Sequence, residues 1–346
     1  MHRRYLSILT LCLPLSLTPA AWGFDHYQPL PTQLPLPADN PPTAAKAALG
    51  ARLFFDTRLL GADSPLSCDS CHTLAHGGSD GQARSHGQHG RLTYRNAPTL
   101  WNIGFQTVLY WDGRAPSLEG QLLDHLRDPQ ISRAPNLGTT VDWLLADAGY
   151  RRDFAAAFPG DDPVTGDNLA RALASFLRSL LTPDSPFDRY LGGERSALSA
   201  SARRGMQIFR DIGCLSCHFG VNLAGPAPGP AMGLGDGFYE LFPNTLGSAY
   251  DRRYRLADDQ GRFEYTGNPW ERYMWRVPIL RNIAETAPYF HNGSVATLEE
   301  AVRVMAKTQL RLDLPIRDVD DIAAFLRSLT GRMSLPAGLA PPGSGK

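Results

Sequence analysis

Apolar residues recur at helical spacing in two segments, one in each half of the chain. In residues 169–180 they lie at positions i, i+4, i+7 and i+11, and in residues 322–329 at i, i+3, i+4 and i+7. Such spacing is typical of amphipathic helices that bury one face. Asp318 lies where its charge favours the start of the second helix, and Gly331 is placed to end it. Alternation typical of β-strands is scarce, so the pattern predicts a mainly α-helical protein.

The first 23 residues have the pattern of a secretory signal peptide. A positive segment at Arg3-Arg4 precedes an apolar run over residues 6–17, and small residues follow between Ala20 and Gly23. The run is too short for a membrane anchor, and no later stretch is apolar enough to span a bilayer. We therefore expect a soluble mature protein without a membrane span, exported to the periplasm.

Composition narrows the class of protein further. The 346 residues include 34 Lys+Arg and 34 Asp+Glu, so there is no basic excess that would indicate a nucleic-acid partner. With 43% hydrophobic residues the chain is neither disordered nor a coiled coil, and its length predicts about two domains. The 33 glycines and 28 prolines exceed average usage, which favours long ordered loops between the helices.

Cysteine spacing carries the strongest chemical signal. Cys12 lies within the predicted signal peptide, and the other four cysteines form two C-x-x-C-H motifs, Cys68-Asp69-Ser70-Cys71-His72 and Cys214-Leu215-Ser216-Cys217-His218. This is the pattern for covalent attachment of c-type haem. Cysteines at i and i+3 reach the two vinyl groups at the haem edge, and the histidine that follows lies beneath the iron as its axial ligand.

Other uses of the four cysteines explain the pattern less well. A structural zinc site needs its cysteine pairs about 15–20 residues apart, whereas Cys71 and Cys214 are separated by 143 positions. Disulfides are usual in exported proteins but do not explain a histidine after each pair. A thioredoxin-like motif is not expected twice outside a βαβ pattern. We therefore predict two covalently attached haem c groups.

The two halves of the chain repeat one another. The frame G-x-x-(L/I)-F precedes each haem motif, at residues 50–54 and 205–209, and the sequence F-L-R-S-L occurs at residues 176–180 and again at 325–329. Each half thus contains a helix, a haem-attachment turn, a loop-rich middle and a closing helix. We predict an all-α fold of two loop-rich cytochrome c-type domains related by internal duplication. The predicted domains are residues 24–182 and 183–346.

Across nearly all of its mature length the chain resembles the bacterial di-haem cytochrome c peroxidases and the related MauG enzymes. Besides the haem motifs, the resemblance rests on four collinear segments: Arg95–Leu100 (R-N-A-P-T-L), Trp111–Arg114 (W-D-G-R), Leu280–Ala284 (L-R-N-I-A) and Thr286–Gly293 (T-A-P-Y-F-H-N-G). The resemblance implies a periplasmic enzyme in which one haem is open to peroxide and the other stores an electron.

The resemblance implies that the C-terminal haem is the electron store, with His218 and a downstream methionine as axial ligands. The matching methionine is Met305, fourteen residues after His291. Methionine opposite histidine raises the haem potential. Spacing alone favours a core residue, because Leu298, Val302 and Met305 have helical core spacing and methionine fills gaps well. MauG has tyrosine as this ligand, so a methionine favours the peroxidases.

The resemblance implies that the N-terminal haem, held by His72, is the site of peroxide reduction. Trp111 matches the tryptophan that relays electrons between the haems, although an ordinary core aromatic has the same sequence signal. Gln121 matches a glutamine of the distal pocket that donates a hydrogen bond to peroxide. The positions that match a calcium site between the domains are Asn96, Thr286 and Pro288. Oxygen ligands, here largely carbonyls and water, suit calcium.

Two positions depart from the peroxidase pattern. Peroxidases that need reductive activation carry a histidine on a mobile loop, which ligates the resting N-terminal iron, and an ungapped count places Gln88 there. His86 and His89 flank it, so a shifted loop could supply a ligand; otherwise this iron is open from the start. The acidic distal residue of the family falls on Ile131, which cannot perform acid–base catalysis. The candidate substitutes are Gln130 and His125. All three histidines are equally well explained as solvated loop residues.

Three functions stay open at this point. The first is a periplasmic di-haem peroxidase that reduces hydrogen peroxide to water with electrons from a small cytochrome or copper protein. The second is a MauG-like enzyme that oxidises tryptophan or tyrosine residues of a partner protein, which the loss of the acidic residue and the gating histidine favours. The third is a non-enzymatic electron carrier with both irons six-coordinate. The oligomeric state is open as well, with a homodimer as one option.

Overall fold

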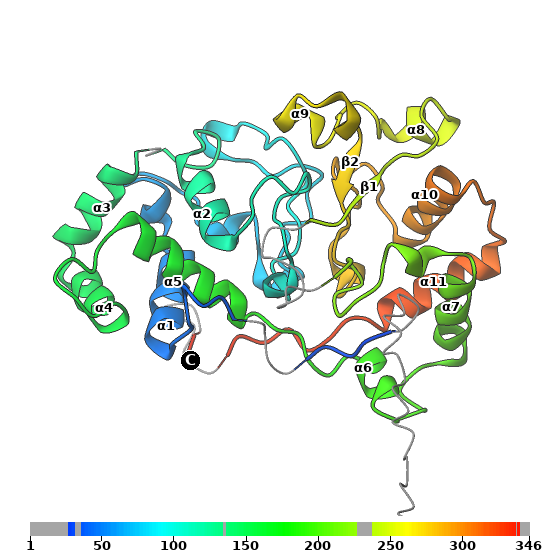
Figure 1. The fold of residues 1–346 in the computed structure, drawn as a ribbon, viewed down its shortest axis with the longest axis horizontal. Helices are drawn as coiled ribbons and strands as arrows, with labels where there is room; N and C mark the ends of the chain where they lie inside the picture. Colours follow the sequence, from blue (N-terminus) through cyan, green and yellow to red (C-terminus); the bar gives the residue numbers. More distant parts are fainter. Residues whose placement is uncertain (1–26, 32–35, 134–135, 227–236, 337, 340–346) are drawn as a thin grey trace, which may run out of the picture.

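Two groups of helices, joined by long loops, make up the fold (Figure 1). The computed structural model describes residues 27–31, 36–133, 136–226, 237–336 and 338–339, so the predicted signal peptide lies outside the described residues. The helices of the first half are α1 (Ala44–Phe55), α2 (Leu118–Arg127), α3 (Leu137–Ala146), α4 (Ala148–Ala157) and α5 (Gly166–Ser179). Those of the second half are α6 (Pro186–Leu191), α7 (Ala200–Asp211), α8 (Ala249–Tyr254), α9 (Phe263–Thr266), α10 (Leu298–Leu310) and α11 (Ile316–Arg327).

Short elements fill the loops. The 3₁₀ turns are η1 (Thr57–Leu60), η2 (Cys68–Ser70), η3 (Leu74–His76), η4 (Gln88–Gly90), η5 (Ile103–Phe105), η6 (Cys214–Ser216), η7 (Pro269–Glu271) and η8 (Ile283–Glu285). Strands β1 (Tyr239–Leu241) and β2 (Met274–Arg276) pair antiparallel in one small sheet, with Tyr239 opposite Arg276. The prediction of a helix-rich protein is confirmed, and the small sheet is an addition that the apolar pattern does not indicate.

Both predicted closing helices are present. Helices α5 and α11 cover the predicted segments 169–180 and 322–329 to within two residues at their C-terminal ends. The prediction that Gly331 ends α11 is wrong, because the helix already ends at Arg327. Gly331 lies in the chain beyond it, where its backbone N–H donates to Asn282 Oδ1 at 3.0 Å. Its role is therefore to let two loops approach, since an added Cβ would lie 2.1 Å from a neighbouring carbonyl oxygen.

In each half, the helix before the haem motif packs on the closing helix, α1 on α5 and α7 on α11. A glycine lies at each crossing. A Cβ added to Gly50 would lie 2.1 Å from Ala172 O, and one added to Gly205 would lie 1.8 Å from Asp321 O. The repeated frame G-x-x-(L/I)-F thus has a packing reason, because its glycine lets the helices approach and its phenylalanine is buried in both halves.

Buried apolar side chains form two clusters, which we call the first and the second core. Most members of the first core come from residues 49–180, and all buried members of the second come from residues 187–329. The ends of the described chain cross between the cores. Tyr27 packs edge-on against Phe187, with ring centroids 5.5 Å apart, in the second core. The C-terminal segment runs back to the first core beside α1 (Figure 1), where Leu339 is buried.

The loops of the two halves also follow similar paths. Asn102 and Asn282 both have left-handed backbone with φ of 61°, directly before the 3₁₀ turns η5 and η8. Both side-chain amides donate to the Thr182 hydroxyl, at 2.7 and 3.0 Å. Further along, single β-bridges close the loops 109–115 and 289–295. These features pair positions of the first half with positions of the second.

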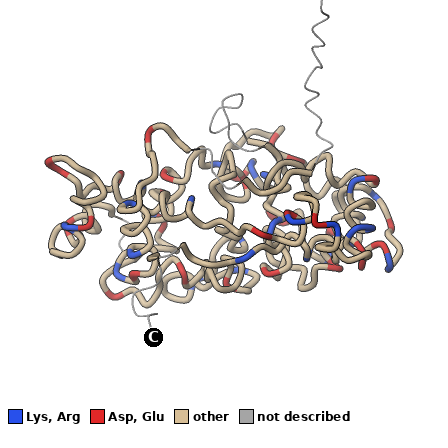
Figure 2. Tube along the Cα trace, turned by 90° about the horizontal axis from the view of Figure 1, so that it is seen from below, with Lys and Arg blue, Asp and Glu red and all other residues tan. Residues whose placement is uncertain are grey.

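Charged residues of both signs are spread over the two halves. Figure 2 shows Lys and Arg interspersed with Asp and Glu along the described trace. Several form ion pairs between neighbouring elements, for example Arg204 of α7 with Asp321 of α11 at 2.7 Å. Within the described ranges, no helix combines the length and the apolar composition that crossing a membrane requires.

Candidate functional site

The two C-x-x-C-H motifs adopt the same turn. In each motif the first three residues form a 3₁₀ turn, η2 or η6, and the histidine N–H donates to the carbonyl of the first cysteine at 3.0 Å. The four cysteines of these motifs are free thiols. A thiol outside a disulfide is available for a thioether bond, so both motifs fit covalent attachment of a haem.

Hydrogen bonds hold the rings of His72 and His218, the two predicted axial ligands. His72 Nδ1 lies 3.2 Å from Gly78 O and 3.1 Å from Pro98 O, and His218 Nδ1 lies 3.0 Å from Leu223 O. A carbonyl only accepts, so Nδ1 carries the proton and the lone pair of Nε2 is left for iron. Burial lowers the pKa of His72 and lowers that of His218 to about 4, so both rings are neutral, as ligation requires.

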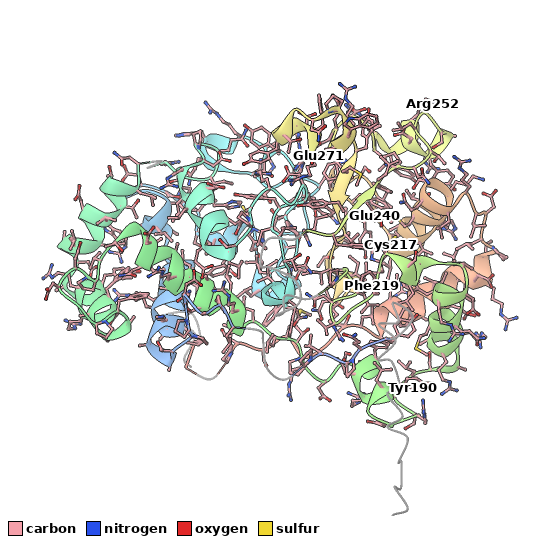
Figure 3. The ribbon with its side chains drawn as sticks, in the orientation of Figure 1. Tyr190, Cys217, Phe219, Glu240, Arg252 and Glu271 are labelled. Atoms are coloured by element: carbon pink, nitrogen blue, oxygen red, sulfur yellow. The ribbon has the colours of Figure 1, made fainter. Side chains whose placement is uncertain are left out.

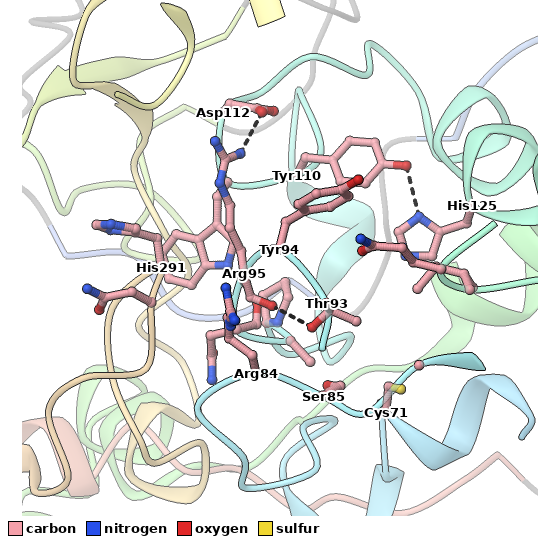
Figure 4. Close-up of a pocket in the computed structure, with 18 of the residues that line it drawn as sticks. Cys71, Arg84, Ser85, Thr93, Tyr94, Arg95, Tyr110, Asp112, His125 and His291 are labelled. Carbon is pink, nitrogen blue, oxygen red and sulfur yellow. Dashed lines mark hydrogen bonds and ion pairs between the residues drawn. The ribbon is translucent and has the colours of Figure 1, made fainter. Parts of the chain in front are cut away.

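A cavity of about 970 Å³ lies beside the first motif (Figure 4). Cofactor sites usually span about 300–1,000 Å³, so the space is sufficient for a haem. Cys71 and His72 line this cavity, as do three residues singled out from the sequence, Trp111, Gln121 and Ile131. One attachment cysteine and the predicted ligand histidine therefore face a space of suitable size.

Gln88, predicted at the position of the activation ligand, does not line this cavity. Its buried amide donates to Ser64 Oγ at 2.7 Å, and its carbonyl oxygen accepts from Arg133 Nε at 2.7 Å. These partners satisfy both ends of the side chain away from the cavity. His86 and His89 are exposed and do not line it either. Among the described residues, the histidines that line the cavity are His72, His125 and His291.

His125, a candidate substitute for the missing acid, lies on α2 and lines the cavity. Its Nδ1 is 2.8 Å from the Tyr110 hydroxyl (Figure 4) and 3.3 Å from the Gln121 amide nitrogen. The Arg114 guanidinium covers the Tyr110 ring at 3.5 Å. Burial, and next the nearby charge of His72, lowers the pKa of His125 to about 3, and burial raises the pKa of Tyr110. Both side chains are therefore neutral at neutral pH.

Gln130 and Ile131 line the cavity together, on the loop after α2. The side-chain oxygen of Gln130 is buried without a hydrogen-bond partner, and the Gln130 carbonyl accepts from Gln88 N at 2.8 Å. Gln130 thus ties this loop to the loop that carries Gln88. Ile131 contributes an apolar side chain where the resemblance implies an acid.

Tyr110 is a site residue that the sequence pattern does not single out. It lies in the bridged loop 109–115, whose counterpart in the second half is 289–295. Tyr110 and Phe290 hold equivalent places in these loops, and both have positive φ, of 67° and 71°. An alignment of the two halves would have identified Tyr110, because it places the tyrosine hydroxyl of the first half opposite the phenyl ring of Phe290 in the second.

Trp111 lies at the boundary between the halves. Its Nε1–H donates to Asn96 O at 2.9 Å, and Asn96 N donates to His291 O at 2.8 Å. The His291 ring stacks on Trp275, with centroids 4.2 Å apart, and meets Trp111 edge-on at 6.4 Å. The backbone carbonyl of Trp111 also accepts from Arg276 N of β2 at 3.0 Å. These contacts fix the orientation of the indole.

The residues of the predicted calcium site, Asn96, Thr286 and Pro288, line one small cavity of about 40 Å³. A single water occupies about 30 Å³, so the space suits one ion or water. The Asn96 amide nitrogen donates to Gln82 O at 2.8 Å, which leaves its oxygen for a cation. Such oxygens suit calcium. Among the described residues, no group of three or more His, Cys, Asp or Glu side chains could hold a metal.

At the second motif, the predicted ligands share one core. Met305 of α10 packs against the second core, and the His218 ring contacts Phe209 of the same core, with centroids 6.1 Å apart. Cys217 lies beside Glu240 of β1 (Figure 3), and burial raises the pKa of its thiol. The arrangement fits a haem attached at Cys217 and packed on the second core.

Two families of known proteins match this chain. Residues 44–196 match the family described as di-haem cytochrome c peroxidase, and residues 275–310 match the family described as RoxA-like, cytochrome c-like. Among curated relatives, cytochrome c peroxidase Ccp of Escherichia coli (strain K12) is 39% identical over 297 residues, which cover 86% of this chain and 60% of that protein. The chain thus spans less than two thirds of the length of that relative.

Two further proteins match over most of both lengths. Cytochrome c551 peroxidase of Pseudomonas aeruginosa is 37% identical over 309 residues, which cover 88% of this chain and 84% of the relative. A solved structure of a MauG-like protein associated with microbial copper homeostasis superposes with a TM-score of 0.78 at 32% identity, and the match covers 93% of this chain and 98% of that one. Since such similarity extends through both haem motifs, the chain belongs to the di-haem cytochrome c peroxidase and MauG family of oxidoreductases.

Proposed function

We propose that this enzyme reduces hydrogen peroxide to water with electrons from a small redox protein, and that peroxide reacts at the haem held by His72. The observation that carries the proposal is the cavity beside the first motif. Its lining combines the axial ligand His72 with the hydrogen-bonding side chain of Gln121, and Gln88 is turned away from it. The cavity therefore has room both for a haem and for a small polar substrate.

When bound, c-type haem supplies the iron and the reversible electron transfer that cleavage of the peroxide O–O bond requires. His72 holds the iron, with its Nδ1–H anchored on two carbonyl oxygens. The Gln121 amide orients peroxide by a hydrogen bond, and Ile131 keeps its part of the wall free of water. Trp111, fixed at the boundary of the two halves, would relay electrons between the two bound haems.

The proposed activity is tested with purified holoprotein, hydrogen peroxide and a reduced small cytochrome c. Oxidation of the cytochrome should depend on both peroxide and enzyme, and His76→Ala, which changes an exposed histidine outside the cavity, should leave the rate unchanged. Negligible turnover by protein that carries both haems rejects the proposal.

The second haem, on His218, is the proposed electron store, with Met305 as its second ligand. Both side chains contact the second core, and a thioether ligand raises the potential, which suits storage of an electron. An EPR and optical redox titration of Met305→Ala should show the loss of one low-spin signal and a lower potential. Met333→Ala, which changes a methionine packed on the first core, is the matched control. Unchanged low-spin signals in Met305→Ala reject this ligand.

One observation favours a second function. Ile131 lines the cavity where peroxidases carry an acid, and a MauG-like protein is a close structural relative, with a TM-score of 0.78. The alternative is an enzyme that uses the same two haems to oxidise tryptophan or tyrosine residues of a partner protein. In that case peroxide produces a long-lived oxidised state that one specific protein quenches, while turnover with reduced cytochrome c stays negligible.

We further propose that residues 24–182 and 183–346 are cytochrome c-type domains related by internal duplication. The glycine crossings of α1 on α5 and of α7 on α11, and the paired turns at Asn102 and Asn282, support this. Comparing the unfolding of the holoprotein as seen by each haem tests whether the halves melt separately.

Two finer features complete the proposal. A calcium ion between the halves is held by the Asn96 amide oxygen and by the carbonyl oxygens of Thr286 and Pro288, whose residues share the 40 Å³ cavity. Export to the periplasm follows from the signal pattern of residues 1–23. N-terminal sequencing of protein from the periplasmic fraction tests the export, and an intact leader or a cytoplasmic location rejects it.

A further inference from the structure

We propose that His125 is the second axial ligand of the iron held by His72, so that the resting peroxide site is closed by a histidine on helix α2. The inference rests on the proposed function for peroxide as the substrate and for Met305 as a ligand. The proposed ligand lies on a helix and not on the loop that carries Gln88, and the Gln88 side chain does not line the cavity.

The register of the two halves places His125 where the second half has Met305. Residues 95–126 align with residues 275–306 without a gap, and each position is 180 residues from its counterpart. The segments S-L-E and T-L-E begin the two helices at the same place in this alignment. His125 and Met305 are therefore equivalent positions on equivalent helices, α2 and α10.

The backbone keeps this register in space. The Ser117 and Thr297 side chains cap α2 and α10, so both helices begin at equivalent residues. Asn102 and Asn282, also 180 positions apart, share the same left-handed backbone. A side chain at position 125 thus leaves its helix as the side chain at 305 does. Methionine and histidine have similar reach, so if Met305 ligates the second iron, His125 reaches the first.

The face of α2 that carries His125 is turned to the cavity. The buried apolar side chains of this helix, Leu118, Leu122 and Leu126, form the neighbouring stripe and do not line the cavity. Gln121 and His125, at i and i+4, share a face and both line the cavity. The Glu119 carboxylate holds α2 on α5 through a bidentate pair with Arg178, at 2.6 and 2.9 Å. The helix therefore presents the imidazole from a fixed base.

The hydrogen bonds of His125 are those of a metal ligand. A ligating histidine almost always donates its other ring N–H to a fixed acceptor, as His72 and His218 do. His125 Nδ1 lies 2.8 Å from the Tyr110 hydroxyl, and that hydroxyl donates to the backbone carbonyl of Gln121 at 3.3 Å. A hydroxyl that donates to a carbonyl can accept from its other neighbour, so we assign the ring proton to Nδ1. With the proton there, the Gln121 side-chain amide, 3.3 Å away, must present its oxygen and not its nitrogen to the ring, and we assign it in that orientation. The lone pair of Nε2 is then free to bind iron, and His125 lines the cavity (Figure 4).

The second half lacks the hydroxyl that a histidine ligand needs. The counterpart of Tyr110 is Phe290, whose ring stacks on Phe242 with centroids 5.2 Å apart and planes inclined by 14°. A methionine ligand has no second donor to orient, so a plain ring suffices there. The first half thus pairs a hydroxyl with His125, and the second pairs a phenyl ring with Met305.

Ligation by His125 predicts how the enzyme is gated. Peroxide can bind only after Nε2 leaves, and this exchange transfers no electron. A haem with two histidine ligands has a lower potential than one with histidine and methionine. The haem of His218 and Met305 therefore takes up the first electron, while the other remains oxidised. Turnover requires the His125 side chain to move off the iron, away from the Tyr110 hydroxyl.

The test is the spin state of the fully oxidised holoprotein, measured by EPR and optical spectroscopy without substrate. We expect two low-spin haems in the unmodified protein. His125→Ala should convert one of them to high spin, Met305→Ala should alter the other, and the control His76→Ala should alter neither. Cyanide should bind at least about tenfold more tightly to oxidised His125→Ala than to the unmodified protein, because a site that is open a tenth of the time binds about tenfold more weakly.

The outcomes separate the inference from the proposed function. Equal low-spin content in His125→Ala and the unmodified protein overturns the inference, whatever the turnover. Two low-spin haems without peroxide turnover support His125 as a ligand and reject the peroxidase. If His125→Ala carries less than two haems per chain, His125→Met is measured instead. It copies the second half and should raise the lower of the two potentials, and unchanged potentials overturn the inference.

Discussion

Replacing Gly205 by alanine tests the close packing of α7 on α11. A Cβ at this position would lie 1.8 Å from Asp321 O, whereas Cβ contacts under 3.0 Å essentially never occur in proteins. Helix α7 must therefore move away from α11 by about 1.2 Å at least. The clashing atoms belong to the backbone of α11, so no change of rotamer relieves the contact.

Two effects of opposite sign determine the outcome. Alanine favours a helix by about 1 kcal/mol over glycine. Overpacking costs about 1–3 kcal/mol, and it is most severe where the backbone must shift. Separation of the helices also loosens the contact of Phe209 with Phe325, whose ring centroids are 5.4 Å apart. We therefore expect a net loss of about 1–2 kcal/mol in the free energy of unfolding, or a Tm lower by about 2–8 °C.

The assay is urea unfolding of the holoprotein, followed by circular dichroism. Gly166→Ala is the matched control, because a Cβ at Gly166 meets Leu137 at an ordinary 3.6 Å and should leave stability unchanged or raise it. Gly50→Ala, with a clash of 2.1 Å against Ala172 O, should behave as Gly205→Ala does. A Gly205→Ala protein as stable as the control would refute the reasoning, since the helices would then have room that the structure does not give them.

Three further predictions concern other contacts. Trp111→Phe removes the indole N–H and its hydrogen bond to Asn96 O at 2.9 Å, a bond worth about 1 kcal/mol. If Trp111 is the relay, electron transfer between the haems should slow in stopped-flow measurements. Equal rates in the variant and the unmodified protein would exclude Trp111 as the relay. Removal of calcium with EGTA should lower the Tm of the unmodified protein, and calcium but not magnesium should restore it. The Tm of Asn96→Ala should not respond to EGTA. If EGTA leaves the Tm of the unmodified protein unchanged, the calcium site is rejected. Burial raises the pKa of Glu119, but its bonds to Arg178 lower it more, so the pKa falls below 4.5. The Glu119–Arg178 pair therefore stabilises the folded protein above about pH 4.5, and this stabilisation is lost as the pH falls through the lowered pKa. The stability difference between the unmodified protein and Glu119→Gln in urea unfolding should therefore shrink in acid, and a difference independent of pH contradicts the assignment.

Features set by neighbours in the sequence could be predicted. The C-x-x-C-H turn is one, because its hydrogen bond joins the histidine to a cysteine four residues before it. The closing helices are another, since their apolar stripes follow from local spacing. The place of Gln88 could not be predicted, because its partners Ser64 and Arg133 lie 24 and 45 residues away. An ungapped count gives the position of a residue along the loop but not the side to which its amide turns.

The two halves carry different side chains on similar backbones, and the separate chemistry that we propose for them rests on a small number of these differences. Gln121 of α2 has Ala301 as its counterpart on α10, and Tyr110 has Phe290. Each change adds a polar group to the first half, where both residues line the large cavity. Since glycine crossings and turns are shared, the fold does not distinguish the proposed peroxide site from the proposed electron store. The proposed distinction lies in the polar side chains with which α2 lines the cavity, because the matching positions of α10 offer no such hydrogen bonds to a substrate.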